Sequence, residues 1–218
     1  MIPLLHDFAE ETVLVVGGGP VGARKARRFA READVVVLSP AFADAEFGDA
    51  RLVRTEPSPA DAGDWVARTD PALVVAATDD AAVNDAFATA AREAGALVNR
   101  ADESGGRDAD SVVVPATVRD DPVTVAVATG GASPALSKYL RERLETEFEG
   151  AGEMAALTAD LRADLKAAGV APNRRREAVR AVVRSDAVWK ALRTGSSNPR
   201  ETAEGVVSSA VGEVTWST

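Results

Sequence analysis

The sequence has no cysteine, a single histidine and few aromatic residues, which make up 5% of its 218 residues. Without cysteine the chain has no disulfide framework, no thiolate ligand for a metal and no cysteine nucleophile. The one histidine, His6, precedes the first predicted strand, and we expect it to be a structural or surface residue. Asp108 and Asp110 share a polar stretch without histidine or cysteine, so we expect no metal site held by the protein.

Long apolar runs and a basic charge are also missing. No apolar run approaches the roughly 18–20 residues that a membrane-spanning helix needs, and residues 1–7 lack the basic and apolar stretches of a signal peptide. The formal net charge of −9 is opposite in sign to the basic surface of a general nucleic-acid binder. We therefore expect a soluble cytoplasmic protein with neither a membrane nor a nucleic acid as partner.

Lysine is scarce, so the positive charge comes almost entirely from arginine. Lysine occurs only at Lys25, Lys138, Lys166 and Lys190. This alanine-rich, lysine-poor and acidic composition resembles that of proteins from salt-loving organisms. It predicts a halophilic protein.

Short apolar runs alternate with helical stretches over the first hundred residues, which is the pattern of a parallel sheet covered by helices. Thr12–Val16 is apolar throughout, as expected for a strand that is buried on both faces. The predicted fold class is α/β, with a Rossmann-type doubly wound parallel sheet in residues 1–110. The predicted strands are 12–16, 35–38, 52–53, 73–77 and 96–98, and the helices are 22–33, one from residue 58, and 80–94.

The alternation of single strands and helices ends after residue 110. Residues 111–114 and 123–128 are predicted strands separated by a turn at 119–122, and Ser133-Pro134 opens a helix that runs to about Glu149. Two or three short helices fill 151–193. We predict a small α+β segment over 111–150, a helical C-terminal domain over 151–195, and a mobile or loosely packed tail over 196–218, which is rich in Ser, Gly and Thr.

A glycine-rich turn follows the first predicted strand. Gly17-Gly18-Gly19-Pro20-Val21-Gly22 lies between a buried strand and the start of a helix. In this context it is a dinucleotide-binding fingerprint, in which glycine lets the backbone approach a pyrophosphate at the N-terminus of a helix. A glycine-rich turn without a ligand is the alternative. The residues predicted to bind the cofactor here are Gly17, Gly19, Pro20, Val21 and Gly22.

The end of the second predicted strand departs from the standard fingerprint. An acid is expected there to bind the ribose hydroxyls of NAD, but the chain reads Leu38-Ser39-Pro40. Ser39 is able to bond a ribose hydroxyl, and no arginine stands close by to favour the phosphate of NADP. We therefore predict NAD as the cofactor, with Ser39 at its ribose.

Two more polar stretches follow predicted strands. Thr78-Asp79-Asp80 either only caps the next helix or also borders the cofactor through Thr78 and Asp79. Asn99 and Asp102 follow the fifth strand, with Asn99 on the cofactor side. Because parallel strands end at one edge, where ligands bind in the crevice, these stretches converge with the glycine turn. Asp102 is the carboxylate predicted to accept a proton or to orient a substrate, with a solvated loop acid as the alternative.

A second glycine turn, Thr129-Gly130-Gly131-Ala132-Ser133-Pro134, leads into a capped helix. Its free N–H groups are suited to hold a carboxylate. A plain connection between a strand and a helix has the same pattern, so both interpretations stay open.

In combination these stretches resemble the dehydrogenase module of siroheme synthesis, the family of precorrin-2 dehydrogenase and sirohydrochlorin ferrochelatase. They occur in the family's order and spacing up to about residue 150. Between Asn99 and Asp102 the chain reads Arg100-Ala101, which departs from the family's usual Asn-Val-Val-Asp. The matching stretches are Val15–Gly22 with Lys25, Ala76–Asp80 with Val83 and Asn84, Asn99 with Asp102, Val114-Pro115, and Gly130–Pro134.

The resemblance implies that NAD accepts a hydride from precorrin-2, giving sirohydrochlorin and NADH, with Asp102 as the catalytic residue. It also implies that residues 111 to about 150 are a dimerisation segment, and hence a homodimer. Some relatives insert ferrous iron as well, using the nitrogens of the macrocycle, and this second activity stays open. The predicted substrate contacts are Gly130, Gly131, Ser133 and Lys138, with Arg107, Arg119 and Arg141 as further basic candidates.

Two other classes of protein share part of the pattern. An NAD(H)-sensing regulatory Rossmann domain of the potassium-transport type also begins with a glycine turn, but it normally keeps the acid after the second strand. A generic NADP-linked reductase needs a proton donor, typically tyrosine with lysine, and the sole tyrosine, Tyr139, lies outside the nucleotide-binding half. The regulatory domain without catalysis is kept as the alternative function.

Overall fold

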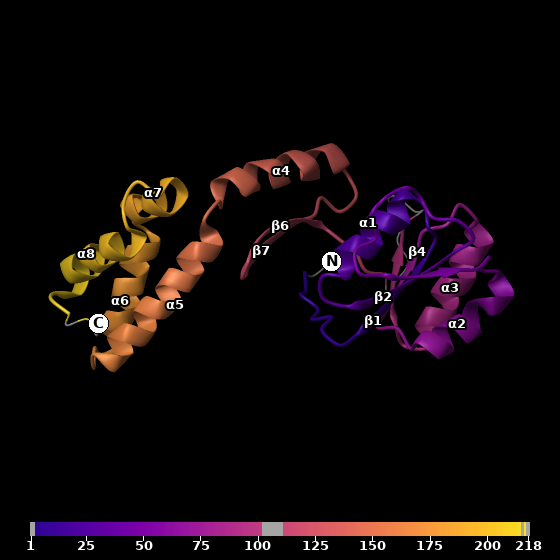
Figure 1. Cartoon of the computed structure of the whole chain (residues 1–218), viewed down its shortest axis with the longest axis horizontal. Coiled ribbons are helices and arrows are strands. Elements are labelled where there is room, and N and C mark those ends of the chain that lie inside the picture. Colours follow the sequence, from indigo (N-terminus) through magenta and orange to yellow (C-terminus); the bar gives the residue numbers. More distant parts are fainter. Residues whose placement is uncertain (1–2, 102–110, 215, 217–218) are drawn as a thin grey trace. The chain divides into compact units, whose positions relative to one another are not determined.

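The computed structural model describes residues 3–101, 111–214 and 216. The chain divides into two compact units (Figure 1). The first comprises residues 1–114 together with 130–132, and the second comprises 115–129 together with 133–218.

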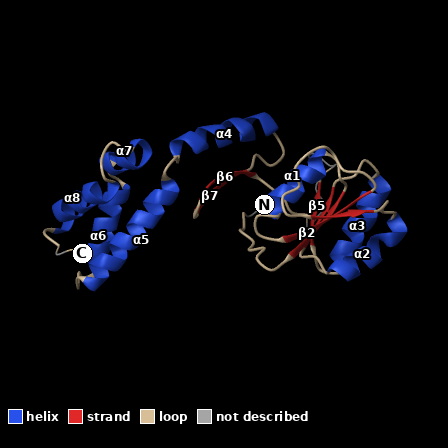
Figure 2. Ribbon diagram, viewed as in Figure 1, coloured by secondary structure: helices blue, strands red, loops and turns tan. Residues whose placement is uncertain are grey.

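The first unit is built on a parallel sheet of five strands in the order β3-β2-β1-β4-β5. This arrangement confirms the predicted Rossmann-type α/β fold. The sheet lies between α1 on one side and α2 and α3 on the other (Figure 2). The strands are β1 (Thr12–Val16), β2 (Asp34–Ser39), β3 (Arg51–Arg54), β4 (Leu73–Ala76) and β5 (Leu97–Arg100), and the helices are α1 (Pro20–Phe29), α2 (Ala62–Thr69) after a short 3-10 turn at Pro59–Asp61, and α3 (Ala81–Glu93).

Alternate residues of each strand face opposite helical layers, because side chains in a strand point to the two faces in turn. Val13 and Val15 of β1 pack with Ala23 and Ala26 of α1. Leu14 points to the other face of the sheet and packs against α2 and α3. All five residues named are at most 2% exposed. Burial on both faces explains why β1, β2 and β4 have nearly continuous apolar sequences.

The chain beyond β5 differs from its prediction. Residues 111–114 are predicted as a strand, but only Ser111 forms a bridge, in parallel with Val98, and the Val112 N–H bonds the Val98 carbonyl at 2.7 Å. The next strand, β6 (Ala116–Asp120), runs into the predicted turn. Its alternation between buried Val118 and exposed Arg119 is that of a half-exposed hairpin strand, so the polar residues are compatible with a strand.

The second unit contains a two-stranded antiparallel hairpin followed by helices. Asp120 at the end of β6 accepts a hydrogen bond from the Gly152 N–H at 3.0 Å, so the hairpin caps the first turn of α5. The helical core is formed around buried Leu161, Leu165 and Val182. The elements are β6, β7 (Val123–Val127), α4 (Pro134–Glu147), α5 (Ala151–Ala167), α6 (Pro172–Val183), α7 (Asp186–Thr194) and α8 (Pro199–Val211).

The C-terminal residues are better ordered than their composition predicts. The prediction of a mobile or loosely packed tail over 196–218 is wrong for Pro199–Val211, which forms α8. Ala203, Val207 and Val211, spaced four apart, lie on one side of this helix and are at most 5% exposed in the helical core. In the described part of the chain, no helix is both long and apolar enough to cross a membrane.

Candidate functional site

The carboxyl ends of the parallel strands meet at one edge of the first unit. The register aligns the last residue of β1, Val16, with Leu38 of β2 and Ala76 of β4, and Ala76 with Arg100 of β5. The last residues of these strands and the residues that follow them therefore share the edge at which open α/β sheets bind ligands. This places the glycine turn, Ser39, Thr78 and Asn99 at one edge, as the sequence predicts.

The glycine turn is shaped by close backbone contacts. Gly17 has φ +118°, and a side chain there would collide with the Ala77 carbonyl. A side chain at Gly22 would collide with the Gly17 carbonyl. Packing of the turn therefore requires glycine at both positions, and their roles in cofactor binding stay predictions.

Gly19 differs, because no atom lies within 4 Å of the position that its side chain would take. It is the N-cap of α1 and provides no side-chain cap, Pro20 occupies the first turn, and no acid follows in that turn. The N–H groups of the first turn and the positive end of the helix dipole thus face an open space. A pyrophosphate fits this arrangement, so the residues present suit a dinucleotide.

Ser39 at the end of β2 is nearly buried, at 6% exposed, and its hydroxyl donates to the Ala41 carbonyl at 2.6 Å. Its oxygen keeps acceptor capacity for a ribose hydroxyl. The expectation that no arginine stands nearby is wrong. Arg54 pairs in register with Ser39 across β2 and β3, and its Nη1 donates to the Pro40 carbonyl at 3.0 Å.

Thr78 is held in its turn by Asn84, a fully buried residue of α3. The Asn84 Oδ1 accepts from the Thr78 N–H (3.1 Å) and lies 2.7 Å from the Thr78 hydroxyl, while the Asn84 Nδ2 donates to the Thr78 carbonyl (2.9 Å). Asp80 caps α3 by accepting from two backbone N–H groups. Asp79 between them is exposed at the edge. Asn84 stands in a stretch that resembles the family, but its sequence position alone does not indicate this role.

Asn99, which is buried, and Lys25, which is partly buried, form a contact between β5 and α1. The Lys25 Nζ donates to the Asn99 Oδ1 at 2.8 Å, and the Asn99 Nδ2 donates to the Val112 carbonyl at 2.8 Å. Burial, together with the charges of Arg28 and Arg24, lowers the pKa of Lys25 to about 8. Asn99 thereby ties together α1, β5 and the segment that returns at residue 111.

The predicted catalytic residue, Asp102, lies outside the described residues, as does Arg107. The residue before Asp102, Ala101, continues the sheet edge, because its N–H bonds the Ala76 carbonyl at 2.9 Å. Arg100 forms an ion pair with Asp85 of α3. The catalytic role of Asp102 stays a prediction.

The second glycine turn spans the boundary between the two units. Gly130–Ala132 group with the first unit, whereas Ser133 and α4 belong to the second. Gly130 and Gly131 both have positive φ, of +64° and +87°. The Ser133 hydroxyl caps α4 by accepting from the Leu136 N–H at 3.2 Å.

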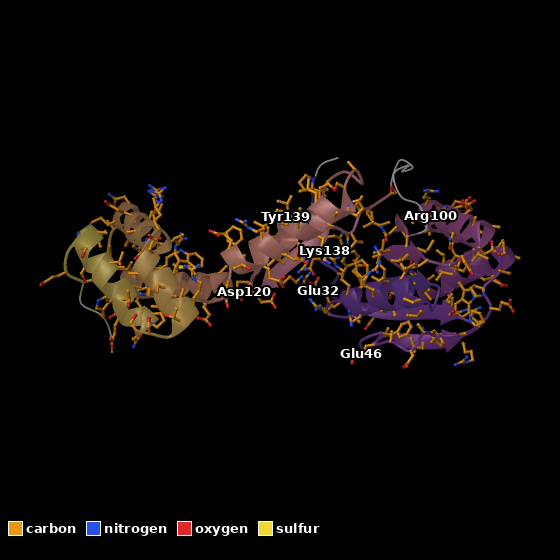
Figure 3. The ribbon with its side chains drawn as sticks, turned by 90° about the horizontal axis from the view of Figure 1, so that it is seen from above. Glu32, Glu46, Arg100, Asp120, Lys138 and Tyr139 are labelled. Atoms are coloured by element: carbon orange, nitrogen blue, oxygen red, sulfur yellow. The ribbon has the colours of Figure 1, made fainter. Side chains whose placement is uncertain are left out.

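Lys138 and Tyr139 stand on α4 (Figure 3). The Lys138 side chain is 74% exposed, and its Nζ lies 3.9 Å from Glu142. Roles for Gly130, Gly131, Ser133 and Lys138 in substrate binding stay predictions. Within the described ranges, no group of three or more His, Cys, Asp or Glu residues is arranged to hold a metal ion.

The sequence matches two family models. Residues 4–116 match the model described as "Putative NAD(P)-binding", and residues 120–147 match "Sirohaem biosynthesis protein central". The chain is 31% identical to a precorrin-2 dehydrogenase of Methanosarcina barkeri over 95% of its own length and 94% of the relative. It is 38% identical to a siroheme synthase of Methylococcus capsulatus over 80% of its length.

The chain spans 36% of the length of that synthase, so it corresponds to about a third of such an enzyme. Among solved structures, SirC, a precorrin-2 dehydrogenase, superposes with a TM-score of 0.66 over 94% of this chain at 23% identity, which supports the fold. The family models match residues 4–116 and 120–147, and the precorrin-2 dehydrogenase matches nearly the whole chain. The chain therefore belongs to the family of precorrin-2 dehydrogenases and the corresponding part of siroheme synthases, with an NAD(P)-binding domain.

Proposed function

We propose that this chain oxidises precorrin-2 to sirohydrochlorin, with NAD as the oxidant, in the cytoplasm. The observation that carries the proposal is the uncapped N-terminus of α1 at the sheet edge where Ser39, Thr78 and Asn99 converge. The chain is also similar over nearly its whole length to a precorrin-2 dehydrogenase, which supports the proposed substrate.

On the cofactor side, the N–H groups that follow Gly19 bind the pyrophosphate, and the Ser39 oxygen accepts from a ribose hydroxyl. Asn84 keeps the Thr78 turn in place beside this position. NAD, when bound, supplies a hydride acceptor. The protein's own part is to hold the reacting carbon of the substrate against that acceptor.

On the substrate side, the oxidation removes two hydrogens, one as a hydride and one as a proton. Asp102 accepts the proton in this proposal, since it is the first carboxylate after β5 in the sequence. Precorrin-2 carries several carboxylates, which an acidic protein must bind through local donors. The N–H groups of Gly130 and Gly131, the Ser133 turn and the Lys138 ammonium supply these donors.

We further propose that the active form is a homodimer formed through the hairpin and α4. A two-stranded hairpin is marginally stable alone in water, and α4 has no buried residue in any of its 14 positions. The residues 111–150 that resemble the family's dimerisation segment contain both elements. A second copy of the chain would cover their exposed apolar side chains.

The experiment that tests the activity is an anaerobic assay with NAD and enzymatically made precorrin-2 in high salt, following the absorbance of sirohydrochlorin and NADH. We expect prompt NADH formation by the full chain. The variant Asp102→Asn should lose about 100-fold or more in kcat, as expected for removal of a general base. The matched variant Asp108→Asn, in the same polar stretch, should keep the rate.

Binding of NAD to each variant, measured by calorimetry, separates catalysis from folding. Retained NAD affinity with lost turnover in Asp102→Asn supports the proposed role. If the wild-type chain binds NAD but forms no NADH, the regulatory NAD(H)-sensing function replaces the proposal. Adding ferrous iron to the sirohydrochlorin product in the same assay decides whether the chain also inserts iron.

A further inference from the structure

The end of β2 lacks the group that usually selects NAD. In the fingerprint an acid at this position bonds the ribose 2′-hydroxyl and repels a 2′-phosphate. Here the strand ends with Ser39, whose hydroxyl already donates to Ala41, followed by Pro40. The next acids along the chain, Asp44 and Glu46, are both exposed and come after the segment that lines the turn. No carboxylate at the strand end therefore opposes a phosphate.

The adjacent strand places a guanidinium at this position. Arg54 is the last residue of β3 and lies beside Ser39 in the parallel register. The next residue continues this pairing, because the Thr55 N–H bonds the Ser39 carbonyl at 3.1 Å. Its side chain turns toward the segment after β2, where Nη1 donates to the Pro40 carbonyl and the guanidinium carbon lies 5.5 Å from the centre of the Phe42 ring. Two contacts thus hold the guanidinium beside the end of β2.

The same segment lies against the glycine turn. The Ala43 N–H bonds the Gly18 carbonyl at 2.8 Å, and a side chain at Gly18 would collide with Ala41 and Phe42. The guanidinium and the fingerprint are therefore connected through one short segment, residues 40–43. A dinucleotide whose pyrophosphate lies at α1 has its adenosine ribose at the end of β2, next to this segment.

Arg54 keeps donors available in this arrangement. A guanidinium has five N–H donors, and within the part of the chain that the structure describes the Arg54 guanidinium makes a single hydrogen bond, to the Pro40 carbonyl. Among the described residues, no carboxylate forms an ion pair with Arg54. Its planar fork matches the geometry of a phosphate, for which arginine forms paired charge-assisted hydrogen bonds.

We propose that Arg54 is a specificity-determining residue of the adenosine-ribose subsite, and that it allows the chain to bind NADP through the 2′-phosphate as well as NAD. The inference rests on the proposed function, because it assumes that a nicotinamide dinucleotide occupies the fingerprint. Arg54 acts on the adenosine end of the cofactor. The hydride acceptor at the other end is the same in both dinucleotides.

The test is a calorimetric comparison of four ligands: NAD, NADP, AMP and 2′,5′-ADP, the last two being the adenosine ends of the first two. They are titrated into the full wild-type chain and into Arg54→Gln, Arg54→Lys and Arg51→Gln. Arg51 is a matched control, because it is an exposed arginine at the opposite end of the same strand.

We expect NADP to bind the wild type within about tenfold of NAD, and Arg54→Gln to weaken NADP and 2′,5′-ADP by about ten- to hundredfold, as for the loss of hydrogen bonds to a charged group. The affinities for NAD and AMP should change by less than about twofold, since the neutral 2′-hydroxyl of these ligands gains little from a surface charge. Arg54→Lys should recover part of the loss, because it restores the charge without the planar fork. Arg51→Gln should match the wild type.

Two results would overturn the inference while leaving the proposed function in place. One is NAD binding with NADP more than about a hundredfold weaker, as when the 2′-phosphate is excluded. The other is an equal loss of affinity for NAD and for NADP in Arg54→Gln, which would mean that Arg54 supports the fold in general. A wild-type chain that binds none of the four ligands would overturn the proposed function together with the inference.

Discussion

Lys25 shows how a single residue shapes the site. Its ammonium is buried between α1 and β5, with Asn99 as its hydrogen-bond partner and the guanidinium groups of Arg24 and Arg28 acting on its charge. Burial disfavours the charged form, so its pKa falls from the ordinary 10.5 to about 8. The charged form is less favourable here than in water, and it lies directly beside the strand that leads to Asp102.

This lowered pKa predicts a pH dependence of stability. The unfolded chain keeps the ordinary lysine pKa of 10.5, while the folded chain has about 8 for Lys25. Between these values the unfolded state binds more protons, so the free energy of unfolding gains a contribution that rises as pH rises from about 8 toward 10.5. Urea unfolding across this range should show a flatter dependence in Lys25→Met than in the wild type. Equal slopes in both proteins would contradict the burial of this charge.

The contacts of individual residues are the feature of the site that is hardest to predict from the sequence. The glycine turn is predictable, because its spacing and position are encoded in six consecutive residues, Gly17–Gly22. The contact between Lys25 and Asn99 joins residues 74 positions apart, and Arg54 lies 14 positions from Pro40. Such contacts depend on which strands become neighbours and on helix placement, which local sequence patterns do not specify.

At the scale of elements, α4 differs from the other α-helices of the described residues in having no buried residue. Leu136 and Tyr139 on this helix are 46% and 54% exposed, and they lie three residues apart on one side. Apolar side chains grouped in this way indicate a contact surface rather than isolated exposure. The proposed homodimer would bury them.

The homodimer predicts that charge on this side of α4 separates the two copies. Tyr139→Glu and Leu136→Glu should shift the mass measured by sedimentation from that of two chains to that of one, because an unpaired buried charge strongly opposes association. Glu145→Gln is the control, since position 145 is nine residues from Leu136 and so on the opposite side of the helix. A wild-type chain that sediments as a monomer at high concentration would refute this contact.

Element types follow from the sequence where packing dictates the pattern. The central strands β1, β2 and β4 are predictable because burial on both faces requires continuous apolar runs. The end of β6 is not, because a half-exposed strand tolerates polar residues such as Arg119 and Asp120 that also suit a turn. The helix α8 escapes prediction because the flanking Ser and Gly residues obscure its four-residue apolar spacing.

At the scale of the whole molecule, the charge is the dominant property. With 34 acidic residues against 25 lysines and arginines, the chain repels itself at low salt. Surface ion pairs such as Arg141 with Glu145 offset little of this repulsion, because exposed pairs contribute weakly. Sequence composition alone predicts this property, since net charge does not depend on the fold.

The acidic charge predicts that salt stabilises the folded chain. Raising potassium chloride from about 0.1 M to about 1 M shortens the Debye length from about 10 Å to about 3 Å and screens the repulsion. The midpoint of thermal unfolding, followed by circular dichroism, should therefore rise over this range. Sucrose titrated in parallel separates screening from general preferential exclusion. Unfolding that became easier in salt would count against a halophilic protein.

The bonds between Thr78 and Asn84 have a consequence for the timing of events in each catalytic cycle. The turn after β4 is fixed by the protein's own side chain, so its conformational entropy is lost once, when the chain folds. With the cofactor placed beside this turn as proposed, a dinucleotide would meet backbone that is already ordered, and no binding free energy would be spent on ordering it. Because the reduced cofactor must leave and an oxidised one must enter for every substrate molecule, this edge of the sheet can exchange them repeatedly without rebuilding itself.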